Sequence, residues 1–255
     1  HPPTTRANEK GFNLMTLPML LVGGYGITGM QVARLLRSRY PDLPLILGGR
    51  SPADGEAFAA EIGNAETVKV DLNKIGLGLP EGKYSLIAVF VKDTSGYTFQ
   101  FAADRRIPHI TASNGIFEIG CEMIMGLTAS HKAPVAIASH WFAGAVAMFA
   151  LHVSAEIPAL DSLDIRVLID STDSRSGPAT AADFERISST CPSTPLYKDR
   201  KLTWSGDSDG ETMKRADGVE VPTTRAVSCD VPSLVRVTGA TSVSVLQAFA
   251  PSSSS

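Results

Sequence analysis

Short apolar runs alternate with amphipathic segments along the first half of the chain. Apolar runs bounded by turn residues predict strands, and apolar positions three and four residues apart predict helices. This alternation is typical of a parallel sheet with helices on both faces. We therefore predict a Rossmann-type, doubly wound α/β domain over residues 16–140. Its predicted strands cover residues 17–24, 41–50, 66–72, 84–93, 107–113 and 133–140, and its helices cover 30–40, 52–63, 97–106 and 118–132.

The pattern changes after residue 140. Period-two alternation and turn residues now predominate, and Asp-Gly pairs at 209–210 and 217–218 favour hairpins. We predict a smaller α+β domain with a mainly antiparallel sheet over residues 141–255, serving substrate binding or dimerisation. Its predicted elements are a helix over 143–157, a strand over 160–170, a helix within 176–188, and strands within 201–221, 223–237 and 241–250.

Composition narrows the functional class. The chain has 255 residues and a net charge of −3, which gives no basic surface for nucleic acid or an anionic membrane. Its apolar runs are too short to span a bilayer, and its polar start does not resemble a signal peptide. The three cysteines lie far apart, which disfavours a disulfide framework or a metal site. We expect a cytoplasmic enzyme acting on a small molecule, without a metal.

A glycine-rich loop lies between the first predicted strand and helix. Its spacing is G-x-G-x-x-G, which in this context predicts a dinucleotide site. The first glycine permits the turn, the second lets a pyrophosphate approach the backbone, and the third lets helix and strand pack closely. Backbone amides at the helix start would face the phosphates, although a tight turn without a ligand is the alternative. The predicted site consists of Gly24, Tyr25, Gly26, Ile27, Thr28 and Gly29.

The end of the second predicted strand indicates the nucleotide. NAD sites usually carry an acid there, whereas this chain has Arg50 and Ser51, which suit a 2′-phosphate. NADP(H) is therefore expected, with a solvated surface arginine as the alternative. Asp71, after the third strand, would accept a hydrogen bond from the adenine amino group or else cap the next helix through the sequence DLNK. Candidates for contact with the diphosphate and nicotinamide ribose are Val91, Lys92 and Asp93, at the end of the fourth strand.

The segments GGYGITG, GGRSPADGEAFAAEIG and VKVDL, at these spacings, resemble the NADP-binding domain of the saccharopine dehydrogenase-like family. The resemblance covers residues 17–140. It implies that the glycine loop holds the pyrophosphate and that Arg50 reads the 2′-phosphate. It also implies reduction or formation of C–N bonds in amino acids or polyamines. Bulky residues 140–142 replace the expected Gly/Pro-rich turn after the sixth strand, which suggests a reshaped, apolar substrate pocket.

A proton donor is the main group that the protein would add to hydride transfer. His140 is the first candidate, because it ends the sixth predicted strand, at the edge where open α/β sheets bind ligands. Tyr97 and Lys92 are the second candidates, and a structural role is the alternative for each. A short-chain dehydrogenase is disfavoured, because it needs a Tyr-x-x-x-Lys pair on one helix face, and we expect no such pair in this chain. A serine hydrolase is disfavoured by the absence of a G-x-S-x-G motif.

The leading hypothesis is an NADPH-dependent reductase that transfers hydride to a C=N bond, or to a C=O or C=C bond, of a small metabolite. A non-catalytic NADP(H)-binding sensor is the second, since Gly23, Gly26 and Gly29 also fit G-x-x-G-x-x-G. A cofactor-free structural homologue is the third. Exposed strands of the second domain could pair across a two-fold axis, which would give a homodimer.

Overall fold

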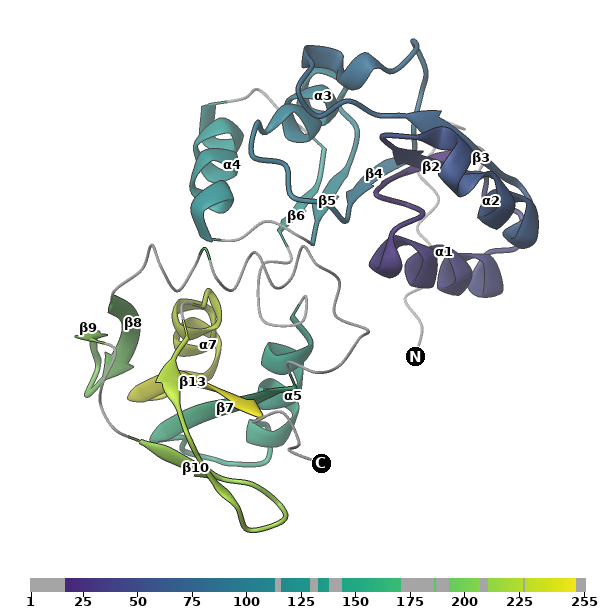
Figure 1. Ribbon diagram of the computed structural model, residues 1–255. Helices are drawn as coiled ribbons and strands as arrows, with labels where there is room; N and C mark the ends of the chain where they lie inside the picture. The colour runs from purple at the N-terminus through teal and green to yellow at the C-terminus, as the bar shows by residue number, and fades with distance from the viewer. Residues whose placement is uncertain are drawn as a thin grey trace. The chain divides into compact units, whose positions relative to one another are not determined.

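The computed structural model describes residues 17–112, 116–128, 133–137, 144–170, 186, 193–206, 211–226 and 228–250. The chain divides into two compact units, residues 1–137 and 138–255 (Figure 1). The division follows Ile137, close to residue 140, where the sequence pattern changes.

The first unit is built on a six-stranded parallel sheet with the order β3-β2-β1-β4-β5-β6. The order reverses between β1 and β4, as in dinucleotide-binding Rossmann sheets, and the predicted fold class is confirmed. The strands are β1 (Met19–Val22), β2 (Leu45–Gly49), β3 (Ala65–Lys69), β4 (Leu86–Val89), β5 (His109–Thr111) and β6 (Val135–Ile137). The helices are α1 (Ile27–Arg39), α2 (Glu56–Ile62), α3 (Tyr97–Arg105) and α4 (Ile116–Thr128), with 3₁₀ turns η2 (Pro52–Gly55) and η3 (Ile75–Gly78).

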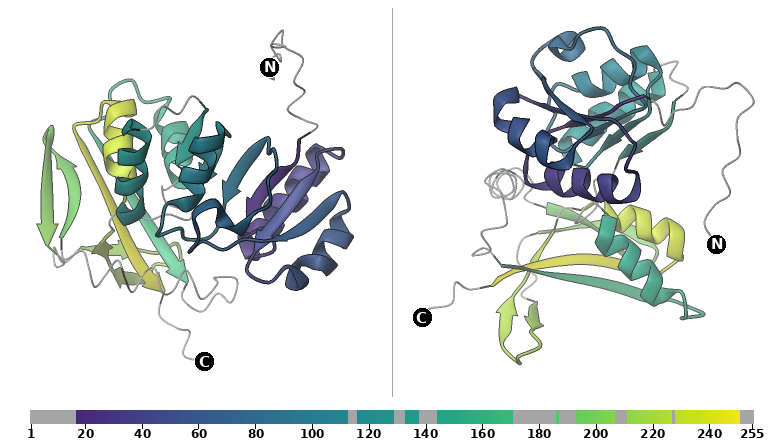
Figure 2. Two further views of the ribbon diagram at one scale, coloured as in Figure 1. Left: turned by 90° about the horizontal axis from the view of Figure 1, so that it is seen from above. Right: turned by 90° about the vertical axis from the view of Figure 1, so that its right-hand side faces the viewer.

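Alternate residues of β1 enter two separate hydrophobic cores. Leu20 and Val22 pack in the cluster that contains Phe101 of α3. Leu21 packs in the cluster that contains Ala33 of α1. Successive side chains of a strand point to opposite faces, so helices must cover both sides of the sheet, as Figure 2 shows. This is why β1 is a continuous apolar run rather than an alternating one.

The end of α1 is tied to its surroundings by Arg37. This half-buried arginine, in the last turn, donates hydrogen bonds to backbone carbonyls before β2 and after α2. Carbonyls at a helix end lack partners within the helix, and a cation there is favourable. The acceptors are the carbonyls of Ile62 (3.1 Å), Tyr40 (3.3 Å), Pro41 (2.5 Å), Leu43 (2.9 Å) and Asn64 (2.9 Å).

The second unit contains a mixed sheet with helices on one face. β13 pairs parallel with β7 over nine residues, whereas its pairs with β8 and β12 and the β8–β9 pair are antiparallel. Helices α5 and α7 lie side by side against this sheet (Figure 2). The elements are α5 (Ala145–Ser154), β7 (Ser162–Asp170), β8 (Ser193–Lys198), β9 (Lys201–Gly206), β10 (Thr212–Lys214), β11 (Glu220–Pro222), β12 (Thr224–Arg225), α7 (Asp230–Thr238) and β13 (Ser242–Ala250).

One of the two predicted hairpins is confirmed. β10 and β11 pair antiparallel around Asp217 and Gly218, and Gly218 has a φ of +89°, which glycine adopts without steric cost. The Asp-Gly pair at 209–210 lies outside the described residues. So does the helix predicted within 176–188, except for Arg186, which is helical.

The strand predicted within 223–237 is wrong for most of its length. After the two residues of β12, the chain forms helix α7. The Ser228 hydroxyl accepts a hydrogen bond from the Asp230 amide at 2.9 Å, and Pro232 lies in the first turn, where a missing amide costs no helical bond. Val231 and Leu234 lie on one buried face, at 0% and 1% exposure. The spacing of these two apolar residues, three positions apart, is the pattern that indicates a helix here.

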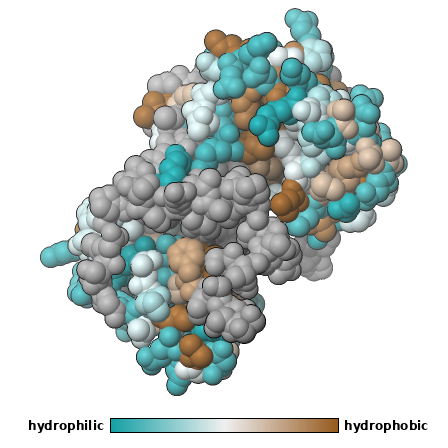
Figure 3. Space-filling model, in the orientation of Figure 1, coloured by the Kyte–Doolittle hydropathy of each residue, from teal (hydrophilic) through white to brown (hydrophobic). Residues whose placement is uncertain are grey.

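The visible surface of the first unit mixes polar and apolar residues, as is usual for globular proteins (Figure 3). Within the described part of the chain, no helix has the length and apolar character needed to cross a membrane.

Candidate nucleotide-binding site

Gly24 and Gly29 are required by close packing of the backbone. A Cβ on Gly29 would lie 2.1 Å from the carbonyl oxygen of Gly23 and 2.8 Å from Cα of Gly24. A Cβ on Gly24 would lie 2.8 Å from the carbonyl oxygen of Leu21. Distances this short are not tolerated between non-bonded backbone atoms. These two glycines therefore let α1 approach the end of β1, with or without a ligand.

Gly26 is different, because a Cβ there would come close to one protein atom only. A Cβ on Gly26 would meet only the carbonyl oxygen of Gly23, at 3.3 Å. Its φ of −81° and ψ of 172° are open to any residue. The backbone conformation therefore does not explain this glycine, and packing explains it only through one tight contact, which a shift of a few tenths of an ångström would relieve. A group that approaches the backbone from outside would explain it.

The N-terminus of α1 offers backbone donors beside Gly26. In a helix the first amides have no carbonyl within the helix to bind, and here these belong to Ile27, Thr28 and Gly29. Gly26, the N-cap residue, has no side chain to accept from them, and the first turn holds no acidic residue. The Ile27 side chain is 52% exposed, so this end faces solvent. The free amides and the helix dipole together favour an anion at this point.

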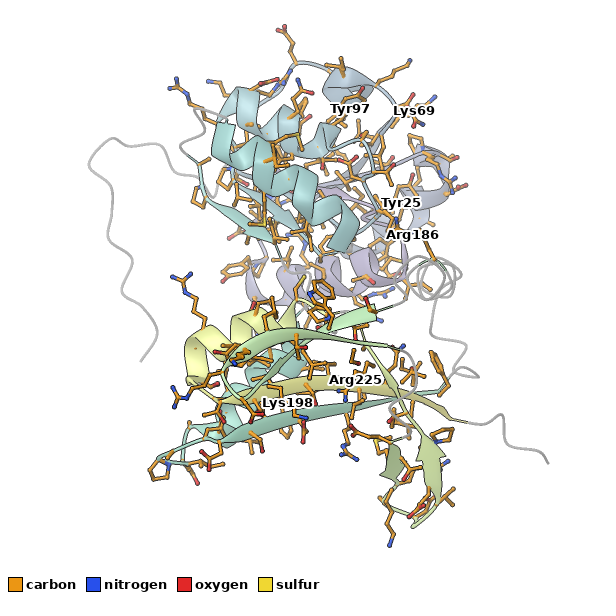
Figure 4. All side chains as sticks on the ribbon, turned by 90° about the vertical axis from the view of Figure 1, so that its left-hand side faces the viewer. Tyr25, Lys69, Tyr97, Arg186, Lys198 and Arg225 are labelled. Carbon is orange, nitrogen blue, oxygen red and sulfur yellow. The ribbon has the colours of Figure 1, made fainter. Side chains whose placement is uncertain are left out.

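Tyr25 joins the glycine loop to the end of β2. Its ring lies so close to Gly49 and Gly55 that a Cβ on them would meet Tyr25 atoms at 2.1 and 2.5 Å. Its hydroxyl accepts a hydrogen bond from the Ser51 amide at 3.2 Å. Burial raises the pKa of the phenol, and Asp54 raises it further, while the Ser51 amide and Arg50 oppose the shift. Figure 4 shows Tyr25 in the first unit.

Sequence reasoning considered only the backbone amide of Tyr25 and missed its side chain. The signal for this contact is the pair Gly49 and Gly55. Neither has a positive φ, so the backbone conformation does not explain why they are glycines. Arg50 and Ser51 follow β2 directly and are both exposed, so their side chains are open to a ligand.

Asp71 holds a local turn. Its carboxylate accepts a hydrogen bond from the Asn73 amide at 3.0 Å, and its carbonyl accepts one from the Lys74 amide at 3.2 Å. The expected helix cap is thus a turn cap, because the carboxylate bonds within this turn and the following η3 has no side-chain cap. A contact with adenine stays a prediction.

The end of β4 lies beside the glycine loop. A Cβ on Gly23 would lie 2.7 Å from Cγ1 of Val91, so the structure brings Val91 against the loop as the sheet order requires. Lys92, the next residue, is half-buried. Both positions follow β4 at the point where the strand order reverses, which is where open α/β sheets bind ligands.

Asp93 organises the segment that follows. It is 2% exposed, and its carboxylate accepts hydrogen bonds from three backbone amides and two hydroxyls. The Thr98 hydroxyl also lies 3.2 Å from Nε2 of the buried His109. Asp93 therefore fixes the chain between β4 and α3. Its donors are the amides of Ser95 (3.1 Å), Gly96 (3.0 Å) and Thr98 (2.8 Å) and the hydroxyls of Ser95 (2.6 Å) and Thr98 (2.7 Å).

The expected proton donors have different positions. Tyr97 is the first residue of α3 and packs, half-buried, against the core that contains Leu20. His140 lies outside the described residues. Tyr197 and Lys201 have the Tyr-x-x-x-Lys spacing, but they lie on the two strands β8 and β9 of a hairpin and not on one helix face. They do not form the pair that a short-chain dehydrogenase needs.

A cavity of about 300 Å³ lies elsewhere in the first unit. Its lining includes Phe99 of α3, Glu122 and Met123 of α4, and Val135 of β6, and no residue of the glycine loop. It is thus separate from the glycine loop. In the described ranges, no three His, Cys, Asp or Glu side chains are grouped to hold a metal ion.

Comparison with known proteins supports the fold. No family model matches the chain, and no curated protein sequence is similar to it. A myo-inositol dehydrogenase from Lactobacillus casei, in complex with NAD(H) and myo-inositol, is similar in structure, with a TM-score of 0.53 and 12% identity over 92% of this chain and 68% of that one. A scyllo-inositol dehydrogenase from the same organism, with bound NAD(H) and scyllo-inositol, gives a TM-score of 0.50 and 11% identity over 92% and 70%.

These identities are low, so the likeness bears on the architecture of the chain. Both similar structures are larger than this chain, which spans about two thirds of each. The resemblance to saccharopine dehydrogenase-like proteins stays a prediction. The chain has the fold of a dinucleotide-binding oxidoreductase.

Proposed function

We propose that this protein is an NADPH-dependent reductase. The observation that carries the proposal is Gly26, which does not need to be glycine for its backbone conformation, has one protein atom near the place of a Cβ, and adjoins amides that have no partner within the helix. A pyrophosphate bound there would use both features. The two similar inositol dehydrogenases, each in complex with NAD(H), favour a nicotinamide cofactor on this fold.

Three parts of the chain would hold the cofactor. The amides of Ile27, Thr28 and Gly29 would bind the pyrophosphate, Arg50 and Ser51 would bind the 2′-phosphate, and the segment after β4 would lie beneath the nicotinamide ribose. NADPH is favoured over NADH because β2 ends in Gly49 and is followed by an exposed arginine, with no acid to bind two ribose hydroxyls.

The cofactor would supply the hydride, and the protein would supply orientation and a proton. Asp93 fixes the chain after β4 through five hydrogen bonds, which gives the nicotinamide end a rigid support. His140, Tyr97 and Lys92 are the candidates for the proton donor. The second unit, with one sheet face covered by α5 and α7, would bind the substrate or a second copy of the chain.

The acceptor bond that we propose is C=N, which follows from the resemblance to saccharopine dehydrogenase-like proteins. C=O and C=C bonds are the alternatives for the same hydride chemistry. A non-catalytic sensor that binds NADP(H) is the second candidate function, and the G-x-x-G-x-x-G spacing of Gly23, Gly26 and Gly29 favours it.

Turnover separates the two functions. NADPH oxidation is followed at 340 nm with panels of small imines, ketones, aldehydes and enones, after NADPH binding has been measured by calorimetry. We expect binding and consumption of NADPH with at least one imine. Binding without consumption across all panels would support the sensor, and a folded protein that binds no nucleotide would overturn both functions.

A further inference from the structure

Gly49 occupies the position where an NAD site carries its ribose-binding acid. That acid ends the second strand, about 20 residues after the last glycine of the loop. Gly49 is the last residue of β2 and follows Gly29 by 20 positions, 49 minus 29. The missing acid is therefore a matter of residue 49 alone, and the atoms around Gly49 show why this residue is glycine.

The Tyr25 ring fills the space that a side chain at position 49 would need. A Cβ on Gly49 would lie 2.1 Å from the Tyr25 hydroxyl oxygen and 2.3 Å from the ring carbon that bears it. Gly55, on the following 3₁₀ turn, also packs against this ring. A carboxylate at position 49 and a tyrosine at position 25 thus exclude each other.

The Tyr25 hydroxyl is arranged to donate its own proton to a ligand. It accepts a hydrogen bond from the Ser51 amide, which uses an oxygen lone pair and leaves the O–H for another acceptor. Burial raises the pKa of the phenol, so it keeps this proton at neutral pH. The nearby Arg50 and Asp54 are both exposed, and Asp54 favours the protonated phenol.

The donors around this point suit a phosphate dianion. The phenol O–H, the Arg50 guanidinium and the Ser51 hydroxyl come from the glycine loop and from the residues directly after β2. A phosphate has only acceptor oxygens, and hydrogen bonds from charged or polarised donors to it are strong. A ribose with two hydroxyls would find no carboxylate at position 49, where the acid of NAD sites lies, and the exposed Asp54 follows on η2.

We propose that Tyr25 is a specificity-determining residue, whose ring replaces the ribose-binding acid and whose hydroxyl donates to the 2′-phosphate of NADPH. The proposal rests on the proposed function, because it assumes that the glycine loop binds a nicotinamide dinucleotide. It adds a side-chain role to a position that the glycine motif leaves open to any residue.

Replacement of Tyr25 by phenylalanine tests the hydroxyl. Calorimetry gives the Kd of NADPH and of NADH for the full-length wild type, for Tyr25→Phe and for the control Tyr40→Phe, whose ring is 46% exposed at the end of α1. We expect Tyr25→Phe to weaken NADPH about tenfold and NADH less than twofold, because only the 2′-phosphate accepts this bond. Tyr40→Phe should leave both values unchanged. The phenylalanine ring keeps the packing against Gly49, and thermal unfolding checks this.

Exchange of the acid and the ring tests the other half of the proposal. Gly49→Asp alone should lower the melting temperature and weaken both nucleotides, since its Cβ meets the Tyr25 oxygen. The double variant Tyr25→Ala/Gly49→Asp should recover the melting temperature and bind NADH more tightly than NADPH. Failure of the double variant to recover either property would overturn the claim of mutual exclusion.

The outcomes separate this inference from the proposed function. A wild type that binds NADPH, together with a Tyr25→Phe variant of equal affinity, would overturn the role of Tyr25 and leave the reductase proposal standing. A wild type that prefers NADH would also overturn the role of Tyr25. A wild type that binds neither nucleotide would overturn both proposals.

Discussion

Gly26 and Gly29 lie three residues apart in one motif and are glycines for different physical reasons. Gly29 lets a helix touch the backbone of a loop, whereas a Cβ on Gly26 would make one tight contact, with the carbonyl oxygen of Gly23. The motif could be found in the sequence, because glycine spacing and the strand-to-helix context are local. The sequence could not show which glycine serves packing, since that depends on the distance between α1 and the carbonyl of Gly23.

The side chain of Tyr25 shows the same limit. Its contacts with Gly49 and Gly55 join residues more than twenty positions apart, and no local pattern indicates such a pair. Asp71 is the opposite case, because the hydrogen bond that it accepts from the Asn73 amide is local. The sequence DLNK predicts a local cap by Asp71, although on a helix and not on a turn. Local hydrogen bonds can be inferred from sequence, and contacts across the sheet edge cannot.

Replacement of Arg50 by alanine tests the choice of nucleotide. We expect the affinity for NADPH to fall about 10- to 100-fold, since hydrogen bonds to charged groups contribute about 1.5–3 kcal/mol. The affinity for NADH should change less than twofold, because NADH lacks the 2′-phosphate. Calorimetric titration of both nucleotides measures the two losses, and Arg39→Ala, an exposed arginine in the last turn of α1, is the control. Equal losses for the two nucleotides would show that Arg50 does not read the phosphate.

At the scale of elements, the strands and helices of the first unit follow the predicted order, and the ends of several differ by a few residues. Strand β4, for example, covers Leu86–Val89 within the predicted 84–93, because Asp93 bends the chain away from the sheet toward α3. Helix α7 was wrongly predicted as strand. Its β-branched valines favour strands intrinsically, and burial of one helical face outweighed that preference.

Arg37 should stabilise the first unit more than any exposed arginine of α1. It donates to five carbonyls that join α1 to the segments before β2 and after α2. We expect Arg37→Ala to lower the free energy of unfolding by about 2 kcal/mol, because several acceptors lose a charged donor at once. Urea unfolding measures this, and Arg39→Ala should cost less than about 0.5 kcal/mol. Similar values for the two variants would refute the role given to Arg37.

At the scale of the whole molecule, periodicity alone indicates one parallel α/β unit followed by a smaller unit with a mainly antiparallel sheet, and the observed second sheet is mixed. Strands of a parallel sheet that is buried on both faces are continuous apolar runs, so the strands of the first unit could be predicted from the sequence. The strand pairing of the second unit could not be predicted in this way, because β7 pairs with β13 in parallel across about 80 positions of sequence. The identity of the proton donor stays a prediction, because the first candidate, His140, lies outside the described part of the chain.

The second unit is where we expect a homodimer to form. Strand β9 lies at the end of its sheet, and Leu202 and Trp204, two positions apart, are 58% and 64% exposed. Light scattering after size exclusion should give a dimer for the wild type and a monomer for Trp204→Lys, because the lysine charge would be buried at the interface. Ile75→Lys, 73% exposed in the first unit, is the control and should remain dimeric. A monomeric wild type would contradict this expectation.

The central claim is that the glycine loop holds the pyrophosphate of a dinucleotide, and a titration of NADPH into Gly26→Ala tests it most directly. The matched control is Gly120→Ala, on helix α4, where a Cβ would meet no atom within 4 Å. We predict that both variants fold, and that Gly26→Ala alone loses NADPH affinity by at least tenfold, because its methyl group occupies the anion's place. Unchanged affinity in a folded Gly26→Ala protein would contradict the account.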